Sequence, residues 1–347
     1  MDLKPLALAL LLAAPAAADP LRLATWNPGL SREGPGLLLR DIEARDPQVM
    51  AAAQIIAVTA PDAILLTAFD WDLDGRALSA FAALLAEAGH PMPHLLAPRP
   101  NSGMPTGLDL DGDGRRGQPR DAQGYGRFTG HGGMALLSRL PLEAVTDHSG
   151  FLWRDLPGHR MPALPPEAAP LQRLSSTGHW DVTLRTPGAP LHLLAFAATP
   201  PAFEPRNIAR NHDETAFWLG HLPSEPFAVI GNLNLDPADG AGDPAAFDRL
   251  LAHVQDPLPR STRSPQPDGA DAGQSGDPQL DTAEYPAPTG NLRLDYILPS
   301  LDVTVSGSGV LWPDPPDPLA ELAAKASHRK LVWIDLELPA PAEAARN

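Results

Sequence analysis

The sequence contains no cysteine, so the fold must be stabilised by packing, with or without a metal, and disulfides carry no information about export. It is also poor in positive charge, with 26 Lys and Arg against 42 Asp and Glu and a net charge of −16. A surface of this sign repels phosphate backbones, which non-specific binders hold through Lys and Arg. The charge therefore argues against nucleic acid as a partner and leaves an unknown small molecule or protein.

Long apolar runs are confined to the start of the chain. Lys4 precedes an apolar stretch that ends in Ala16-Ala17-Ala18, a pattern typical of a signal peptide cleaved before Asp19. Such a run is too short for a stable anchor, and no later one reaches the roughly 18 apolar residues of a membrane span. We expect a signal peptide at residues 1–18, a periplasmic or secreted location and no contact with the membrane after cleavage. The alternative is an uncleaved amphipathic leader.

Residues 19–347 are enough for one large α/β domain, and no linker clearly separates two cores. Apolar segments at 21–26 and 63–69 predict strands. Asp46 and Pro47 predict a capped helix start, and a second helix is expected to end near residue 85. Seven further apolar segments predict strands in mixed sheets. The other expected elements are helices around 210–219 and 243–253 and long loops at 91–130 and 257–290.

Eight motifs occur in order along the chain, and together they resemble the endonuclease/exonuclease/phosphatase superfamily, specifically its exported bacterial branch. The resemblance implies a four-layer α/β sandwich, in which two mixed β-sheets pack face to face between helices and the site lies at the strand ends on one edge. The motifs are ATWN (24–27), ILLTAFD (64–70), GMALLSR (133–139), HLLAFAATPP (192–201), RNHDE (210–214), VIGNLNLDP (229–237), LRLDYILPS (292–300) and ASHRKLVW (326–333).

The chemistry of that family depends on carboxylates. A Glu that ends an early strand and an Asn of the first strand hold a divalent cation, an Asp in a G-D-x-N motif prepares the attacking water, and a His in a terminal S-D-H motif stabilises the transition state. The present chain keeps Asn27 of the first strand, Asn234 of G-D-x-N and Asp295 in L-D-Y. The resemblance implies that these three residues form a partial polar site.

Other family positions are replaced. Ala68 stands at the metal-binding Glu, and a methyl group cannot hold Mg²⁺. Asn232 stands at the Asp of G-D-x-N, and a neutral amide does not accept a proton from water as a carboxylate does. Ala197 replaces a His. The purely structural interpretation is that the two alanines fill core space and that Asn232 bonds a loop at a strand end. Gly132 stands where relatives carry Tyr.

The tail motif allows two alignments. In the first, His328 takes the family's Asp position and Arg329 its His position. In the second, shifted by one residue, His328 is the catalytic His and Ser327 takes the Asp place.

Losing a general acid or base costs about 10²-fold to 10⁴-fold in rate. We therefore expect an exported protein of this fold that is inactive or severely impaired and acts in binding. The alternatives are an active Mg²⁺-dependent phosphoesterase with a rearranged site and a calcium-stabilised protein with an unrelated ligand.

Acidic spacing indicates a calcium loop. Asp109, Asp111, Asp113 and Gly114 match the start of the D-x-D-x-D-G pattern, whose closely spaced oxygens wrap one cation. Arg120 stands where the pattern's last Glu belongs, so further ligands must come from elsewhere, for example Asp121. The alternative is an acidic, solvated turn. The similar segment at 70–75 is better explained as a cap between a strand and a helix.

Two further residues are candidates for substrate binding. His212 lies in RNHDE, at an expected helix start, where the alternative is a cap with a satisfied surface His. Arg173 could meet a phosphate, although a lone Arg before a turn is more often a solvated or salt-bridged side chain.

Overall fold

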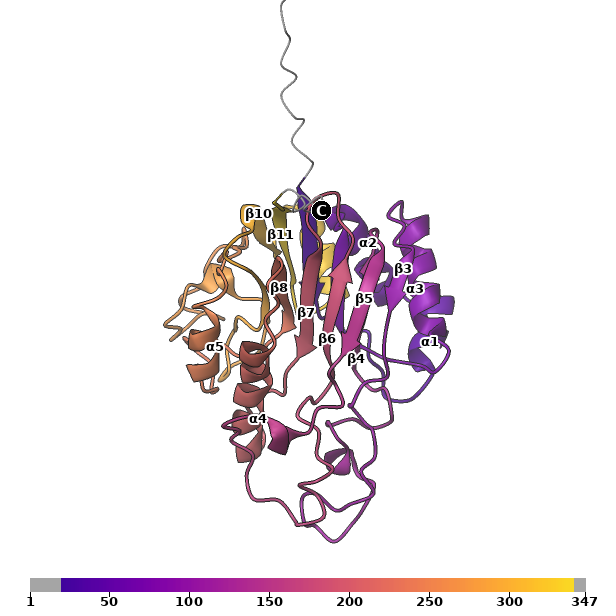
Figure 1. The fold of residues 1–347 in the computed structure, drawn as a ribbon. Helices are drawn as coiled ribbons and strands as arrows, with labels where there is room; N and C mark the ends of the chain where they lie inside the picture. Colours follow the sequence, from indigo (N-terminus) through magenta and orange to yellow (C-terminus); the bar gives the residue numbers. More distant parts are fainter. Residues whose placement is uncertain (1–19, 340–347) are drawn as a thin grey trace, which may run out of the picture.

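The computed structural model describes residues 20–339, and the expected signal peptide lies outside them. The described chain folds into eleven strands in two sheets with helices on the outside (Figure 1). Within it, no helix is long and apolar enough to cross a membrane.

The larger sheet has six strands in the order β10-β11-β1-β2-β4-β3, and only β1 and β2 run parallel. Its strands are β1 (Leu21–Trp26), β2 (Ala63–Phe69), β3 (His94–Leu96), β4 (Gly133–Ser138), β10 (Thr304–Leu311) and β11 (Leu331–Glu337). The mixed pairing confirms the expectation from the short connections.

The smaller sheet has five strands in the order β5-β6-β7-β8-β9, and only β7 and β8 run parallel. Its strands are β5 (Leu142–Asp147), β6 (His179–Leu184), β7 (Leu191–Ala197), β8 (Phe227–Asn232) and β9 (Asp295–Pro299). Each sheet therefore contains one pair of parallel strands, and the carboxyl ends of the two strands in a pair lie at the same edge of their sheet.

Helices complete four layers. The six-stranded sheet carries α1 (Leu37–Glu43), α2 (Pro47–Thr59), α3 (Arg76–Glu87) and α6 (Pro318–Ala326), and the five-stranded sheet carries α4 (Pro205–Ala216) and α5 (Ala245–Leu250). Four short 3₁₀ turns also occur, at Pro119–Asp121, Trp153–Asp155, Phe217–Gly220 and Pro278–Leu280. As predicted, Asp46 caps α2 by accepting from Gln48 N at 2.9 Å, and Asp72 caps α3 by accepting from the N–H groups of Arg76 and Ala77, each at 2.8 Å.

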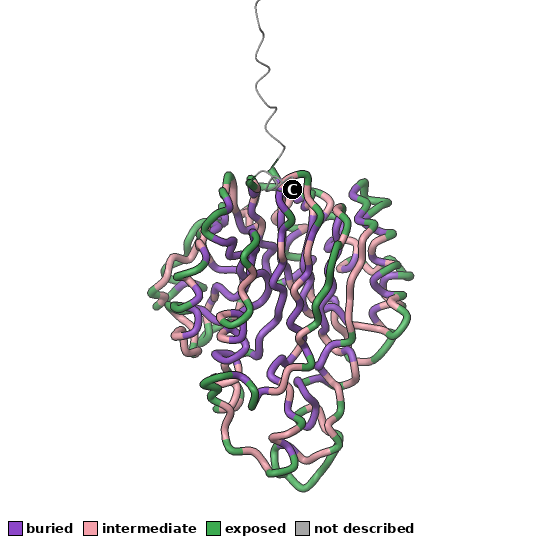
Figure 2. The backbone as a smooth tube through the Cα atoms, in the orientation of Figure 1, coloured by how far each residue is buried: buried purple, intermediate pink, exposed green. Residues whose placement is uncertain are grey.

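A shared apolar core joins the two sheets. Leu65 and Val332 of the larger sheet and Leu193 and Ile230 of the smaller one belong to one cluster of buried side chains. Two further clusters lie under the outer helices, so buried residues fill the centre of the molecule (Figure 2). The four-layer α/β sandwich is confirmed.

The structure corrects the sequence-based elements at five places. The helix expected to begin near Arg210 begins at Pro205, so most of RNHDE lies in its second half. Strands β3 and β5 and helices α1 and α6 were not predicted, and β3 lies within the expected loop 91–130. Five of the six residues of β5 are exposed, and such a strand at a sheet edge lacks an apolar run.

A loop-rich lobe extends beyond the strand ends below β6 and α4 (Figure 1). It contains most of the long 91–130 loop and the segment that leads into β6, and the two are hydrogen-bonded, for example from Asn101 N to Thr177 O at 2.8 Å. The lobe matters because it covers one side of the strand-end edge.

Candidate functional site

Residues at five strand ends meet at one edge. Asn27 follows β1, and Ala68 lies at the end of β2 beside it. In the other sheet Ala197, Asn232 and Asp295 are direct neighbours across β7, β8 and β9. The placement follows from the two parallel pairs, because the carboxyl ends of parallel strands lie together.

The tail joins the same edge through hydrogen bonds. Ser327 Oγ donates to Asn27 O at 2.9 Å, and Trp26 Nε1 donates to Arg329 O at 3.0 Å. Gln48 Nε2 donates to the carbonyls of both Pro28 and Ala326 at 2.7 Å. The convergence expected for Asn27 and the tail is therefore observed.

Arg329, rather than His328, is the tail residue that reaches Asp295. Its Nη2 lies 3.0 Å from Asp295 Oδ2, and its Nη1 donates to Tyr285 Oη at 2.9 Å. Asp295 is fully buried and Arg329 is 4% exposed, whereas His328 is exposed. The geometry agrees with the first of the two tail alignments.

The charge of Asp295 is neutralised inside the protein. Burial raises the pKa of its carboxyl, and the positive charge of Arg329 opposes that rise. Partial burial and the charges of Arg329 and Lys330 lower the pKa of His328. Asp295 and Arg329 therefore form a buried ion pair.

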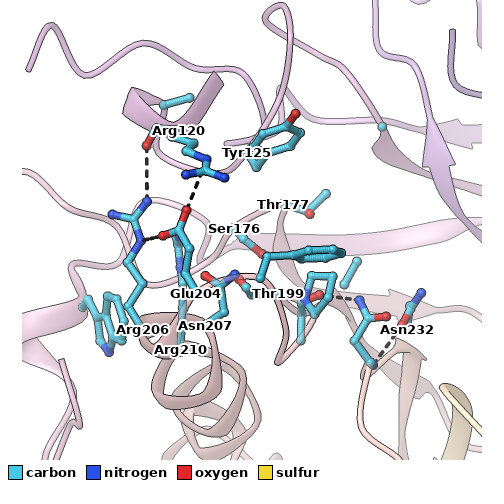
Figure 3. Close-up of a pocket in the computed structure, with 18 of the residues that line it drawn as sticks. Arg120, Tyr125, Ser176, Thr177, Thr199, Glu204, Arg206, Asn207, Arg210 and Asn232 are labelled. Carbon is cyan, nitrogen blue, oxygen red and sulfur yellow. Dashed lines mark hydrogen bonds and ion pairs between the residues drawn. The ribbon is translucent and has the colours of Figure 1, made fainter. Parts of the chain in front are cut away.

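A cavity of about 460 Å³ lies between the strand ends and the lobe (Figure 3). Five of the singled-out strand-end residues line it, namely Asn27, Ala68, Ala197, Asn232 and Asn234. Gly132 lines it too, whereas Asp295, His328 and Arg329 do not. Ala68 is not fully buried, so for this residue the filled-core interpretation is wrong: its methyl group forms part of the cavity wall.

The amide oxygens on the cavity floor are already occupied. Asn27 Oδ1 accepts from Gly29 N at 3.0 Å, and Asn232 Oδ1 accepts from Asn234 N at 2.9 Å. Within residues 20–339, the Nδ2 groups of Asn27 and Asn232 have no hydrogen-bond partner. Asn234 is oriented the other way, because its Nδ2 donates to Ala198 O at 2.7 Å. The floor therefore offers N–H donors from two of its three amides.

Two floor residues have a strained backbone. Ala68 has φ = 51° and Asn234 has φ = 49°, in the left-handed region that costs a non-glycine residue about 1 kcal/mol or more. Ala68 lies in the irregularity where β2 pairs with β4. The backbone thus keeps a sharp bend where the family places its metal-binding Glu.

The opposite side of the cavity carries charge. Glu204 precedes α4 and lies between two guanidinium groups, 2.6 Å from Arg206 Nε and 3.4 Å from Arg120 Nε (Figure 3). Arg120 belongs to the lobe, so this contact fastens the lobe to α4. Sequence reasoning did not single out Glu204 or Arg206, and it named Arg120 only as the residue at the last position of the calcium-loop pattern.

The RNHDE segment is buried beneath the cavity. Glu214 accepts from Ser176 N, Ser176 Oγ and Thr199 N at 2.6–2.7 Å, and burial raises its pKa. Arg210 donates to four carbonyls of the lobe and lines the cavity. These contacts hold the lobe against α4.

Neither of the candidate substrate-binding residues lines the cavity. His212 is buried in the second half of α4, where its Nδ1 lies 2.8 Å from Asp213 Oδ1. The Nη1 of Arg173 donates to Asn101 Oδ1 at 2.8 Å inside the lobe. His212 is therefore neither at a helix start nor on the surface.

The acidic loop lies directly behind the cavity wall. Carboxylate oxygens of Asp109, Asp111 and Asp121 lie within 4.8 Å of one another. Asp113 is not in this group, and its carboxylate instead accepts from Arg115 N and Gln118 Nε2. Asp121 is therefore the third carboxylate of the group, where the D-x-D-x-D-G spacing predicted Asp113. Calcium binding at this loop stays a prediction, since backbone N–H groups also satisfy Asp109 and Asp121.

Comparison with known proteins gives one family. The model of the endonuclease/exonuclease/phosphatase family matches residues 25–329. A search of curated proteins found no significant match.

Solved structures give the same fold. An endonuclease/exonuclease/phosphatase from Beutenbergia cavernae DSM 12333 superposes with a TM-score of 0.57 at 19% identity, over 93% of this chain and 72% of that one. A family protein from Leptotrichia buccalis C-1013-b gives 0.55 at 13% identity, over 92% and 100%. An endonuclease/exonuclease/phosphatase from Bacteroides vulgatus gives 0.50 at 11% identity, also over 92% and 100%.

Proposed function

The chain belongs to the endonuclease/exonuclease/phosphatase family, and from this premise we propose that it has kept the family's cleft as a binding site and lost phosphoester hydrolysis. The observation that carries the proposal is the cavity floor. Ala68, Ala197 and Asn232 line it where the family supplies a metal-binding Glu, a His and a water-activating Asp.

The donor set of the cavity does not fit Mg²⁺. This cation prefers carboxylate oxygens. Among the described lining residues the single carboxylate is Glu204, which two arginines already hold. The side-chain oxygens of Asn27 and Asn232 each accept a backbone N–H group, so the amide NH₂ group is the end without a hydrogen bond in the described chain. An amide NH₂ group is a donor and does not bind a cation.

The charge balance behind the floor also opposes catalysis. The buried Asp295–Arg329 pair takes the place of an Asp–His pair, and a guanidinium cannot give up a proton near neutral pH. With no carboxylate free to activate water, the remaining polar groups can bind and orient a ligand but have no base for hydrolysis.

A hydrolysis assay tests the proposal. Purified protein is given bis(p-nitrophenyl) phosphate and p-nitrophenyl phosphate with Mg²⁺, Mn²⁺ or Ca²⁺, and turnover near background is expected. Turnover of about 1 s⁻¹ or faster, an ordinary enzyme rate, overturns the proposal if Asn27→Ala abolishes it. Activity that survives Asn27→Ala belongs to a contaminant.

We also propose that the protein acts outside the cytoplasm. The support is the charged, then apolar, then small-residue pattern of residues 1–18. Cell fractionation and N-terminal sequencing of the native protein test it: a mature chain that begins at Asp19 in the periplasm or medium is expected. A cytoplasmic chain that retains Met1 or Asp2 as its first residue contradicts it.

A further inference from the structure

The ionisable side chains that line the cavity have the opposite sign to the protein as a whole. Three arginines, Arg120, Arg206 and Arg210, face one carboxylate, Glu204, in a chain with a net charge of −16. Burial lowers the pKa of Arg210 to about 10, so it remains charged at neutral pH. The buried Glu214 beneath the lining and the carboxylates of Asp109, Asp111 and Asp121 behind the wall are negative, so the excess of positive charge belongs to the lining itself.

The cavity floor adds neutral donors. Asn232 is 5% exposed, lines the cavity, and has its oxygen fixed by Asn234 N, so its unpaired Nδ2 is the end available to a ligand. The Nδ2 of Asn27 is free in the same way within the described chain. Both amide groups line the cavity and can donate to a ligand oxygen there.

The lining also contains neutral polar residues, such as Thr177 and Thr199, together with apolar and aromatic ones. Phe203 is 88% exposed at the cavity and has φ = 71°, and Tyr125 is 61% exposed. Trp153 and Leu164 also line the cavity. An exposed aromatic side chain held in a strained backbone is explained if a ligand packs against it.

We propose that the cavity binds an organic anion with an aromatic or apolar body, without a metal ion. The arginines at the start of α4 and on the lobe attract the anionic head, Phe203 and its apolar neighbours pack against the body, and Asn27 and Asn232 donate to ligand oxygens on the floor (Figure 3). The inference rests on the proposed binding function and specifies its ligand class. Phosphate monoesters and carboxylates share this chemistry.

Thermal shift and calorimetry with the full mature chain in EDTA test the class. The probes are phenyl phosphate, 3-phenylpropionate, inorganic phosphate and the neutral 3-phenylpropanol. Phenyl phosphate, 3-phenylpropionate or both are expected to raise the melting temperature at millimolar concentration, and each organic anion that binds should exceed the neutral alcohol by at least about tenfold in affinity. Comparing the two organic anions shows which head group the cavity prefers.

Three variants locate the site. Asn232→Asp should weaken the organic anions by about tenfold or more, because it replaces a donor with a like charge. Arg206→Gln should weaken every anion. Phe203→Ala should weaken the aromatic anions and leave inorganic phosphate unchanged. Arg185→Gln is the matched control, because Arg185 lies on an exposed turn and pairs with Glu143.

Each outcome decides something. Failure of both organic anions to bind in EDTA, equal binding of the neutral alcohol, or unchanged anion affinity in Asn232→Asp overturns the ligand class. A change of melting temperature in the ligand-free Asn232→Asp or Arg206→Gln variant does not prevent the test. In that case, calorimetry below the unfolding transition of the variant still measures its affinity for each probe. Hydrolysis of phenyl phosphate with added Mg²⁺, lost in Asn27→Ala, overturns the proposed function while leaving metal-free anion binding intact.

Discussion

Removal of Arg329 should expose the cost of burying the Asp295 carboxylate with which it forms an ion pair. Asp295 Oδ2 accepts from Arg329 and from Thr282 at 3.0 Å, while Oδ1 has no hydrogen-bond partner within the described chain. In Arg329→Met the fully buried carboxylate keeps only Thr282. Leaving one buried charge uncompensated costs about 3–5 kcal/mol of unfolding free energy. The matched surface variant Arg139→Met, which breaks an exposed pair with Asp62, should cost at most about 1 kcal/mol.

The loss should depend on pH in a defined direction. Burial raises the pKa of Asp295 above its unfolded value and Arg329 opposes this, so removing Arg329 raises the folded-state pKa further. A group whose pKa is raised on folding contributes fully below its unfolded pKa, about 3.9, and loses that contribution as pH rises through the folded value. The deficit of Arg329→Met should therefore be larger at pH 8 than at pH 5.

Urea unfolding followed by tryptophan fluorescence at both pH values measures this deficit. In the double variant Asp295→Asn with Arg329→Met, the loss should be smaller than the sum of the two single losses. A deficit below about 1 kcal/mol, equal to that of the Arg139→Met control, or one that is the same at pH 5 and pH 8, would refute the reasoning about the pair.

Three other predictions follow from the site and its surroundings. A triple variant with Ala68→Glu, Asn232→Asp and Arg329→His should raise the rate of p-nitrophenyl phosphate hydrolysis with Mg²⁺ by more than the product of the three single effects. A gain equal to that product contradicts coupling between the three positions. Millimolar Ca²⁺ should raise the melting temperature of the wild type and not of Asp111→Ala, and an unchanged wild-type curve removes the calcium prediction. Burial lowers the pKa of His179 to about 3, so stability should fall as pH drops from about 6.5 towards 3. In His179→Gln the slope of unfolding free energy against pH should be shallower by up to about 1.4 kcal/mol per unit, and equal slopes exclude His179 as the cause.

Most of the strands could be predicted from local sequence. Residues 63–69 form a run that is apolar on both faces, and the structure buries it between an inner core and helices, as such a run predicts. The carboxyl ends of parallel strands lie together at one edge of a sheet. Asn27, Ala68 and Asn232 were therefore correctly expected to lie close to one another. The residue type at each of those positions is read directly from the sequence.

The choice between His328 and Arg329 required the tertiary structure. Neighbouring residues of an extended chain point to opposite sides, so a shift of one residue exchanges the buried and the exposed side chain. Both alignments satisfied the motif, and only the position of Asp295 on another strand decides that Arg329 is inside. A similar limit applies to His212, which was predicted to bind substrate at a helix start: the helix begins at Pro205 instead of near Arg210, so His212 is buried in α4 and does not line the cavity.

The sequence by itself indicated most of the strands and fixed the residue types at the strand ends, because apolar periodicity and residue identity are local properties, whereas the four layers were implied by the family resemblance. The tertiary structure alone decided which amide ends face the cavity and which charges surround it. Arg120 and Glu204 are far apart along the chain, and their contact exists only because the lobe folds back onto α4. No local pattern encodes such a contact, because it depends on the conformations of loops. Hydrogen bonds between these loops and the side chains of Glu214 and Arg210 fix those conformations in the folded state.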